Sequence, residues 1–500
     1  MGNIKGGYSS SSVPVKHITL GGGLNTASGP LNLQDNEASD LQNVDFDKFG
    51  SVVKRGGYEK LHTTKVVSTT QSSLYWYVTT TSRKAIMVAE DKIYRMDNLD
   101  GTWDDITSGG NCVITPGHLF CFETFLGNLY ATNNYNLPIR YINSGEAYHS
   151  ITAAGGNITE ALSRAKFVTK YQNYLMYANV TISGASRPSR FYWSAIRDDT
   201  SWSAADFIEV SQEDGEEITG FKVLGDKLVV YKLNSIYVVS FTGDSTIPFI
   251  MQKSNSAVGC VAPYSIQEVD NGHVFMSYDG LHYFDGANSY KISDRINDTI
   301  NGLNRSEFSK AVSMYQKTKN QYWIALADSG KTVNNKIFTW NAFNNSFSKY
   351  DGFSASGMSI FLVGGYEERP YFSDYDGFAY QAEHGTSDYP SGSVTNISAY
   401  YYTNWKSYDD ICDKKGVPHA YIYYKNQAGA FDFGYEYDFV TSTGYSVNIA
   451  TASTIGATNM SKRIDLIGRG RVVRFKISGN SNTNFQIDGI GALPYLDTNI

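Results

Sequence analysis

The sequence has few cysteines, and their spacing excludes the common cysteine frameworks. Cys112, Cys121, Cys260 and Cys412 form no CxxC unit and do not lie at metal-ligand spacing with histidines. They are expected to be buried free thiols, which suits a protein that folds in a reducing cytoplasm. No metal site and no cofactor is predicted.

Long apolar runs and an excess of basic charge are absent as well. No run reaches the roughly eighteen apolar residues of a membrane helix, and Met1–Lys16 is rich in Gly and Ser without an apolar core. We therefore expect neither a secretion signal nor membrane insertion, and we expect synthesis in a cytoplasm. The net charge of −7 argues against a general nucleic-acid binder, because such binding depends on Lys and Arg neutralising phosphates.

Motifs of catalysis are also missing. Gly21–Gly23 has no following GK[ST], so residues 1–30 are predicted to be a flexible arm and not a phosphate loop. The segment Gly352–Gly357 places its second glycine one position too late for a nucleophile elbow. The eight histidines show no HExxH pattern. We predict that the chain is not an enzyme and has no catalytic residues.

Two carboxylate-rich loops keep an alternative open. Propeller glycosidases work with pairs of carboxylates, so the loops Arg197–Asp199 and Glu213–Glu217 are candidates, although Asp and Glu at hairpin tips are usually solvated turn residues. The aromatic runs Tyr400–Tyr402 and Tyr423–Tyr424 are compatible with sugar stacking, but strand residues facing opposite sides of a sheet are the commoner explanation. A carbohydrate-binding or carbohydrate-cleaving propeller that acts on bacterial surface glycans is the alternative function.

The residues that are abundant favour an all-β protein of more than one domain. The 500 residues include 38 Tyr, 26 Phe and 46 Gly, and only 18% are charged. Aromatic residues favour pleated strands and glycines favour turns. A single core stops growing well below this length, so a second domain is expected.

Hairpins recur along the chain and predict a β-propeller of six or seven blades over residues 31–385. Each hairpin has two alternating strands around a Gly, Asn or Asp turn, and units begin roughly 35 to 55 residues apart, as propeller blades do. Regular hairpins also build sandwiches and barrels, which remain a second possibility. The hairpins are Ile86–Arg95, Leu119–Ala131, Phe167–Ala178, Phe221–Val230 and His273–Phe284, with further units around Tyr315–Trp340 and Ile360–Tyr380. Part of Val44–Leu61 is expected to lie beside the last blade, near Tyr371–Gln381, and to close the ring.

After a linker near residue 385 the strands become longer and alternate polar with aromatic residues. Residues 390–500 are therefore predicted to form a smaller, β-sandwich-like domain. The densest basic stretches are Lys54–Arg55 and the cluster of Lys462, Arg463, Arg469, Arg471 and Arg474. We expect these to serve folding or subunit contacts more than DNA binding.

A linear series of motifs resembles one phage family. The series is Arg187–Ser194, Thr200–Trp202, Phe207–Val210, Ile218–Gly220, Leu228–Lys232, Ser235–Val239, Val258–Pro263 and Ser277–Leu281, followed by Phe284–Gly286. In this order the motifs resemble the short-tail nozzle proteins of bacteriophages, also called tail tubular protein B-like proteins, and the DNA-stabilisation hub proteins. The ends of the chain, Leu41–Leu61 and Gly468–Leu496, resemble the ends of that family.

The resemblance implies a structural protein of a podovirus virion tail. Family members form a ring, commonly a homohexamer, below the portal and adaptor, where they retain DNA and later let it pass during genome ejection. The implied partners are further copies of the chain, the portal and adaptor, other tail proteins and, transiently, viral DNA. The family carries no catalytic residues. A lumen that lets DNA slide is expected to be acidic and polar.

Overall fold

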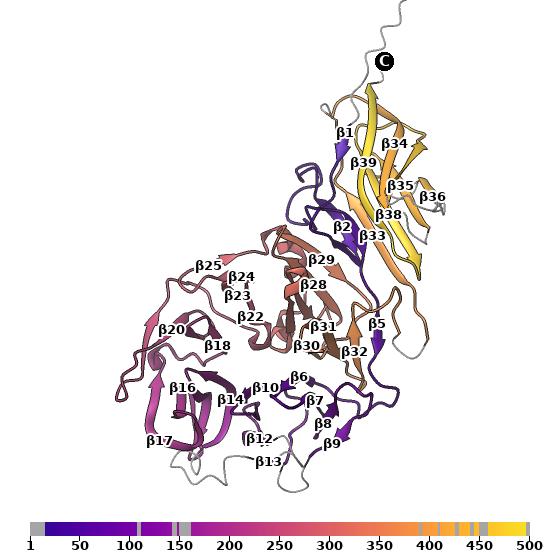
Figure 1. Cartoon of the computed structure of the whole chain (residues 1–500). Helices are drawn as coiled ribbons and strands as arrows, with labels where there is room; N and C mark the ends of the chain where they lie inside the picture. Colours follow the sequence, from indigo (N-terminus) through magenta and orange to yellow (C-terminus); the bar gives the residue numbers. More distant parts are fainter. Residues whose placement is uncertain are drawn as a thin grey trace, which may run out of the picture. The chain divides into compact units, whose positions relative to one another are not determined.

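The computed structural model describes residues 16–107, 112–142, 148–149, 162–389, 393–408, 411–425, 430–440, 445–449 and 459–496. Strands dominate the regular secondary structure of the described residues, and the helical elements are few and short (Figure 1). They divide into two compact units. Unit 1 comprises Met1–Arg55, Phe343–Ser348 and Asn396–Ile500, and unit 2 comprises Gly56–Ala342 and Lys349–Thr395.

Unit 2 is a β-propeller. Its described residues form seven four-stranded antiparallel sheets, which Figure 1 shows arranged around one axis, and we number these blades 1 to 7. This confirms the all-β propeller and selects seven blades. Blade 1 contains β6 (Ser72–Val78), β7 (Arg83–Ala89), β8 (Lys92–Asp97) and β9 (Asp104–Asp105). Blade 2 contains β10 (Cys121–Phe125), β11 (Asn128–Thr132), β12 (Ile139–Tyr141) and β13 (Tyr148–His149).

The next three blades follow in chain order. Blade 3 contains β14 (Leu162–Tyr171), β15 (Tyr174–Ile182), β16 (Ala185–Ala195) and β17 (Asp198–Glu209). Blade 4 contains β18 (Gly220–Leu224), β19 (Lys227–Tyr231), β20 (Ile236–Phe241) and β21 (Phe249–Lys253). Blade 5 contains β22 (Gln267–Val269), β23 (Gly272–Ser277), β24 (Gly280–Phe284) and β25 (Ser289–Lys291).

Blades 6 and 7 complete the ring. Blade 6 contains β26 (Val312–Gln316), β27 (Gln321–Leu326), β28 (Lys336–Asn341) and β29 (Ser346–Tyr350). Blade 7 contains β30 (Gly357–Val363), β31 (Glu367–Ser373), β32 (Ala379–Ala382) and, from the other end of the propeller, β5 (Tyr58–Lys60). The helical elements are short: η1 (Gln212–Asp214), η2 (Pro263–Ser265), η3 (Asp294–Ile296), α2 (Asn297–Asn301), η4 (Arg305–Lys310) and η5 (Lys317–Lys319).

Tight turns and aromatic contacts explain why these residues form blades. Gln172 and Asn173 both have positive φ, at 49° and 66°, which is the geometry of a two-residue hairpin turn. The turns after β10 and β23 lie at 126–127 and 278–279, inside the hairpins predicted at Leu119–Ala131 and His273–Phe284. Between blades 3 and 4, the ring of Phe191 lies 5.3 Å from that of Phe221. Such contacts bury both faces of each blade.

The N-terminal strand β5 closes the ring, as predicted for part of Val44–Leu61. It pairs with β32 in the register Tyr380 with Lys60, Gln381 with Glu59 and Ala382 with Tyr58. Closure places the first strand of the propeller in its last blade, so that no blade is left with three strands.

Unit 1 is a β-sandwich built from both ends of the chain. Its six-stranded sheet contains β1 (Lys16–Ile18), β3 (Val44–Phe46), β4 (Val52–Lys54), β34 (Lys415–Lys425), β37 (Asn459–Asp465) and β39 (Gln486–Leu496). Its five-stranded sheet contains β2 (Ala38–Gln42), β33 (Ile397–Thr403), β35 (Phe431–Tyr437), β36 (Tyr445–Ile449) and β38 (Val473–Ser481). Aromatic rings join the sheets, as where Tyr424 lies 5.4 Å from Phe431.

The expected domain boundaries therefore change at the N-terminal side. Residues 31–55, assigned to the propeller, and the described part of the arm lie in unit 1, because β1 and β4 pair with β39 and β2 pairs with β33. The arm is not free at Gly21–Gly23, since a Cβ on Gly21 would lie 2.6 Å from the Cα of Gly50. Residues 1–15 lie outside the described residues.

Candidate functional site: the axis of the propeller

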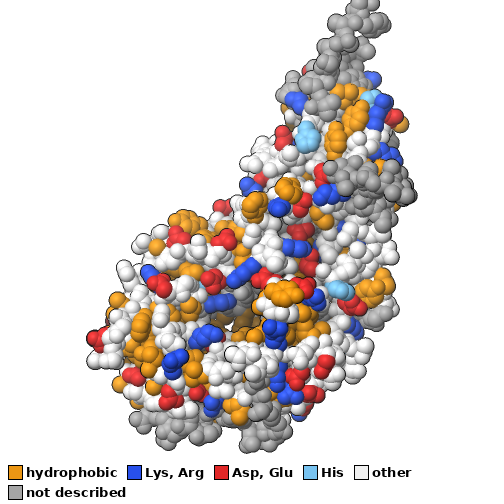
Figure 2. All heavy atoms as spheres, viewed as in Figure 1, with side chains coloured by type: hydrophobic (Ala, Val, Ile, Leu, Met, Phe, Trp, Pro, Cys, Tyr) orange, Lys and Arg blue, Asp and Glu red, His pale blue; other side chains and the backbone are white. Residues whose placement is uncertain are grey.

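The first strand of every blade lies at the axis. Each of these strands pairs with a single neighbour in its own blade, so a row of backbone N–H and C=O groups on its other edge faces the centre. Residues from all seven strands line a cavity of about 210 Å³. Figure 2 shows the hollow in the lower part of the molecule, with several blue side chains around it. Backbone groups at such an edge need side chains or water as partners.

A tyrosine crosses the axis and fills part of it. Tyr264, just before β22 of blade 5, donates its hydroxyl hydrogen bond to the carbonyl of Leu119, just before β10 of blade 2, at 2.8 Å. Tyr264 packs with the buried side chains of Leu119, Val312 and Met358. The remaining space of about 210 Å³ is large enough for ordered water. The Tyr264 side chain therefore stands in the way of a polymer along the axis.

A buried lysine joins three blades through this wall. Lys222 of β18 donates from Nζ to the carbonyl of Ile266 at 2.7 Å and to Oε1 of Gln267 at 3.3 Å. Gln267 in turn donates to the carbonyl of Ser313 at 2.9 Å. Burial lowers the pKa of Lys222. Lys222 and Gln267 thus each donate a hydrogen bond to a backbone carbonyl of the next blade. They were not singled out from the sequence, because one Lys and one Gln on separate strands form no motif.

The only acid in the lining is already engaged. Glu123 forms an ion pair with Nζ of Lys170 at 3.1 Å and accepts the backbone N–H of that residue at 3.3 Å. Cys121 donates from Sγ to the carbonyl of Val168 at 3.4 Å, and burial raises the pKa of its thiol to about 11. Glycoside cleavage uses two carboxylates about 5 to 10 Å apart. The lining supplies one, together with a neutral thiol.

The acids of the two predicted loops are held by basic or polar partners. Asp199 pairs with Arg140 at 3.1 Å and accepts the hydroxyl of Tyr130. Asp198 accepts Thr200 Oγ1 at 2.6 Å.

The second loop is held in the same manner. Asp214 pairs with the buried Lys232, and Glu217 pairs with Lys166 at 2.9 Å. These acids stabilise the turns in which they lie, and the structure does not bring the two loops' carboxylates together with Glu123 in the cavity lining.

The remaining residues flagged in the sequence also have structural surroundings. Ser356 is buried and accepts the N–H of Ser72, while Ser354 is exposed. Cys112 and Cys260 are buried, Cys121 is partly buried and Cys412 is exposed, and all four are free thiols. Within the described ranges, no three His, Cys, Asp or Glu side chains gather as a metal site would require, and no helix is long and apolar enough to cross a membrane.

The basic stretches divide between exposed and enclosed residues of unit 1. Arg463, Arg469 and Arg471 are exposed and Lys462 is partly exposed, whereas Lys54, Arg55 and Arg474 are held within the unit. Lys54 and Arg55 are 2% and 1% exposed, and Lys54 donates to the carbonyl of Thr483 at 3.1 Å. Arg474 pairs with Glu436 at 2.6 Å, and its guanidinium lies 4.3 Å from the ring centre of Tyr402. Lys54, Arg55 and Arg474 are therefore not available to phosphates.

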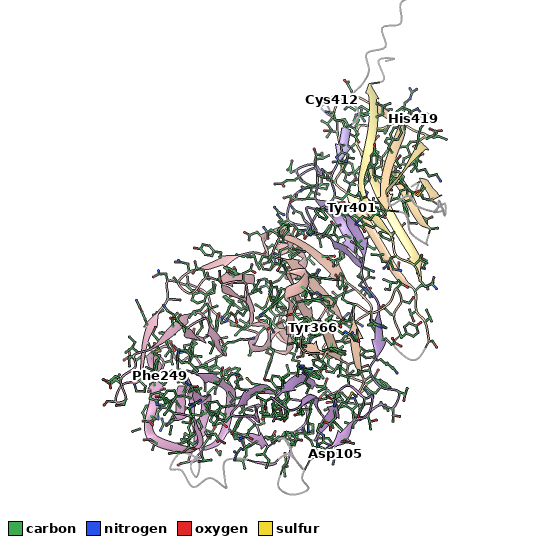
Figure 3. The ribbon with its side chains drawn as sticks, viewed as in Figure 1. Asp105, Phe249, Tyr366, Tyr401, Cys412 and His419 are labelled. Atoms are coloured by element: carbon green, nitrogen blue, oxygen red, sulfur yellow. The ribbon has the colours of Figure 1, made fainter. Side chains whose placement is uncertain are left out.

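The aromatic runs follow the alternation of their strands. Tyr401 and Tyr424 are buried between the sheets, whereas their neighbours Tyr400, Tyr402 and Tyr423 are partly or well exposed. Figure 3 labels Tyr401 in this unit.

One family model matches this chain. Residues 150–333 match the family described as "Bacteriophage P22 Gp10, beta-propeller". The propeller resembles that of a phage tail stabilisation protein. The matched range includes blades 3, 4 and 5 and the first two strands of blade 6. No curated protein matches the chain.

Several solved structures are distantly similar. PorZ, a surface component of the type-IX secretion system of Porphyromonas gingivalis, is 13% identical with a TM-score of 0.40, and the match covers 72% of this chain and 44% of PorZ. BBS1N, from its complex with ARL6DN, is 9% identical with a TM-score of 0.41, covering 67% and 97%. An exo-β-1,3-galactanase of Phanerochaete chrysosporium is 10% identical with a TM-score of 0.26, covering 91% and 99%. These likenesses are too distant to bear on function.

Proposed function

We propose that this chain is a non-enzymatic structural component of a podovirus tail. In this proposal copies assemble as a ring, a homohexamer, below the portal and adaptor and form part of the nozzle or hub. The observation that carries the proposal is the match of residues 150–333 to a phage propeller family. The seven closed blades agree with the propeller named in the description of that family.

The DNA channel of the proposal runs through the ring and not through a propeller. Each propeller axis is crossed by the side chain of Tyr264 and holds only about 210 Å³ of free space. The wall that faces DNA therefore consists of outer strands, turns or sandwich surfaces of several copies. A cyclic ring with such a lumen needs two different contact patches on each copy.

Cryo-electron microscopy of virions that contain the chain tests this proposal. We expect density for a ring of these propellers at the base of the portal, around a channel on the ring axis. Virions that lack the chain but retain and eject DNA normally would contradict it, as would density that places the chain outside the tail.

A further inference from the structure

The outer face of the six-stranded sheet in unit 1 carries a row of aromatic and polar side chains. In the sheet register Tyr421 lies opposite Gly491 on one side and Arg463 on the other, and His17 lies opposite Gly491 from the far strand. Directly opposed residues in antiparallel strands share a face. On the next row Tyr423 lies opposite Gly489.

Glycines in the central strand leave room for the rings. A Cβ at Gly489 would lie only 2.9 Å from Nε2 of His17, so the imidazole occupies the space above this glycine. The imidazole centre is 6.2 Å from that of the Tyr423 ring. Tyr423 is 38% exposed and His17 is also exposed. His17, Tyr421 and Tyr423 thus form an aromatic platform.

A hydrogen-bonded triad borders the platform. Asp465 accepts from Nδ1 of His419 at 2.8 Å and from Nε of Arg463 at 3.0 Å, and Arg463 also donates to Nε2 of His419 at 3.1 Å. All three side chains are at least partly exposed. The triad therefore presents donors and acceptors in a fixed arrangement, and the charges of Arg463 and Asp465 offset each other. Figure 2 shows orange, pale-blue and blue side chains close together in the upper part of the molecule, where Figure 3 labels His419.

We propose that this face binds a neutral carbohydrate, with a sugar ring stacked on Tyr421 and Tyr423 and its hydroxyls bonded to the triad. The negative face of an aromatic ring attracts the polarised C–H groups of a sugar ring. Sugar hydroxyls both donate and accept, as the triad does. This binding goes beyond the tail-ring function and does not depend on it.

Two other classes of occupant fit the face less well. Single-stranded nucleic acid also stacks on aromatic rings, but it needs a positive groove along its backbone, and Arg463 is neutralised by Asp465 here. The core of a protein–protein interface is depleted of charged groups, whereas this face has a charged triad beside its rings.

Binding of the full-length chain to neutral oligosaccharides tests the proposal. The probes are hexasaccharides of glucose, galactose, mannose and rhamnose, with an oligothymidylate of similar length as the competing class. We expect saturable binding of at least one sugar. Tyr421→Ala and Tyr423→Ala should each weaken it about tenfold, which corresponds to about 1.4 kcal/mol.

Matched variants separate stacking from folding. Tyr423→Phe keeps the ring and should weaken binding much less than Tyr423→Ala does, whereas Arg463→Lys should weaken binding because a lysine cannot make the two directed bonds of a guanidinium. Tyr366→Ala removes a tyrosine that is 85% exposed on the propeller (Figure 3) and should leave binding unchanged. The proposal is overturned if no sugar binds the folded chain, if the Tyr421→Ala/Tyr423→Ala chain binds equally well, or if only the oligothymidylate binds.

Discussion

Truncation of Tyr58, on the strand β5 that closes the propeller, should destabilise the propeller strongly. We call β5 the latch. Tyr58 on β5 is 5% exposed, and its ring lies 5.1 Å from Phe353, 5.3 Å from Phe372 and 5.3 Å from Tyr380. Its hydroxyl donates to the carbonyl of Gly352 at 2.8 Å. Truncation of a buried aromatic residue to alanine costs about 3 to 5 kcal/mol. We expect Tyr58→Ala to fall at the upper end, about 5 kcal/mol, because the hydrogen bond is lost as well.

Tyr58→Phe separates the two contributions. It keeps the three ring contacts and removes only the hydrogen bond, which is worth about 1 kcal/mol. Denaturant unfolding of the full chain gives the free energies. Hydrogen exchange of the β32 amides reports whether the loss is local to the latch, since Tyr380 and Ala382 pair with β5. If the free energies of unfolding of Tyr58→Ala and Tyr58→Phe lie within about 0.5 kcal/mol of each other, the aromatic contacts of Tyr58 are not what keeps the propeller closed.

Two other substitutions test buried charge and buried histidine. Arg474→Ala should cost about 3 kcal/mol because it strands Glu436 in the sandwich, whereas the exposed Arg471→Ala should change unfolding by less than about 0.5 kcal/mol in the same denaturant titration. Burial, and then the charge of Lys222, lower the pKa of His273 to about 3, against 6.5 for an ordinary histidine. Between pH 6.5 and about 3 the unfolded chain binds more protons than the folded chain. The free energy of unfolding should therefore decrease as the pH is lowered below 6.5, by up to about 1.4 kcal/mol per pH unit. His273→Gln should make this dependence on pH less steep. An equally steep slope in the variant would contradict this assignment.

The sequence predicted the blades better than the division into units. Alternating strands and tight turns are local features, so hairpins such as Phe167–Ala178 were placed correctly, with their turn at Gln172 and Asn173. The pairing of β5 with β32 joins residues more than three hundred positions apart. It was predicted because an open ring would leave an unpaired blade edge, which is a general requirement of the architecture.

The N-terminal half of the sandwich was missed for the opposite reason. Strands β1 and β3 have only three residues each, too short for a recognisable alternation. Gly21–Gly23 was interpreted as flexible because glycines favour loops, yet a Cβ on Gly21 would lie 2.6 Å from the Cα of Gly50. A close approach between distant segments leaves no local pattern. The crossing of the axis by Tyr264 was missed on the same ground, since no motif distinguishes a tyrosine that spans a channel.

Several Lys and Arg side chains are buried in ion pairs or hydrogen bonds, and this bears on how strongly the chain can bind DNA. Lys232 and Lys406 are buried against Asp214 and Asp35, and Lys54 and Arg55 lie inside the sandwich. These cations cannot approach phosphates, so the exposed surface has fewer basic groups than the composition implies, in a chain whose net charge is already −7.

The exposed surface of the chain should therefore bind duplex DNA weakly. Binding through phosphates weakens steeply with salt, with a slope of log K against log salt of about −0.9 per phosphate contacted. We expect the full-length chain to show a slope no steeper than about −2 in a fluorescence titration, as suits a channel wall along which DNA slides. A slope near that of a protein with six or more phosphate contacts would show that the exposed Lys and Arg side chains form a basic surface. It would refute an acidic or neutral lumen.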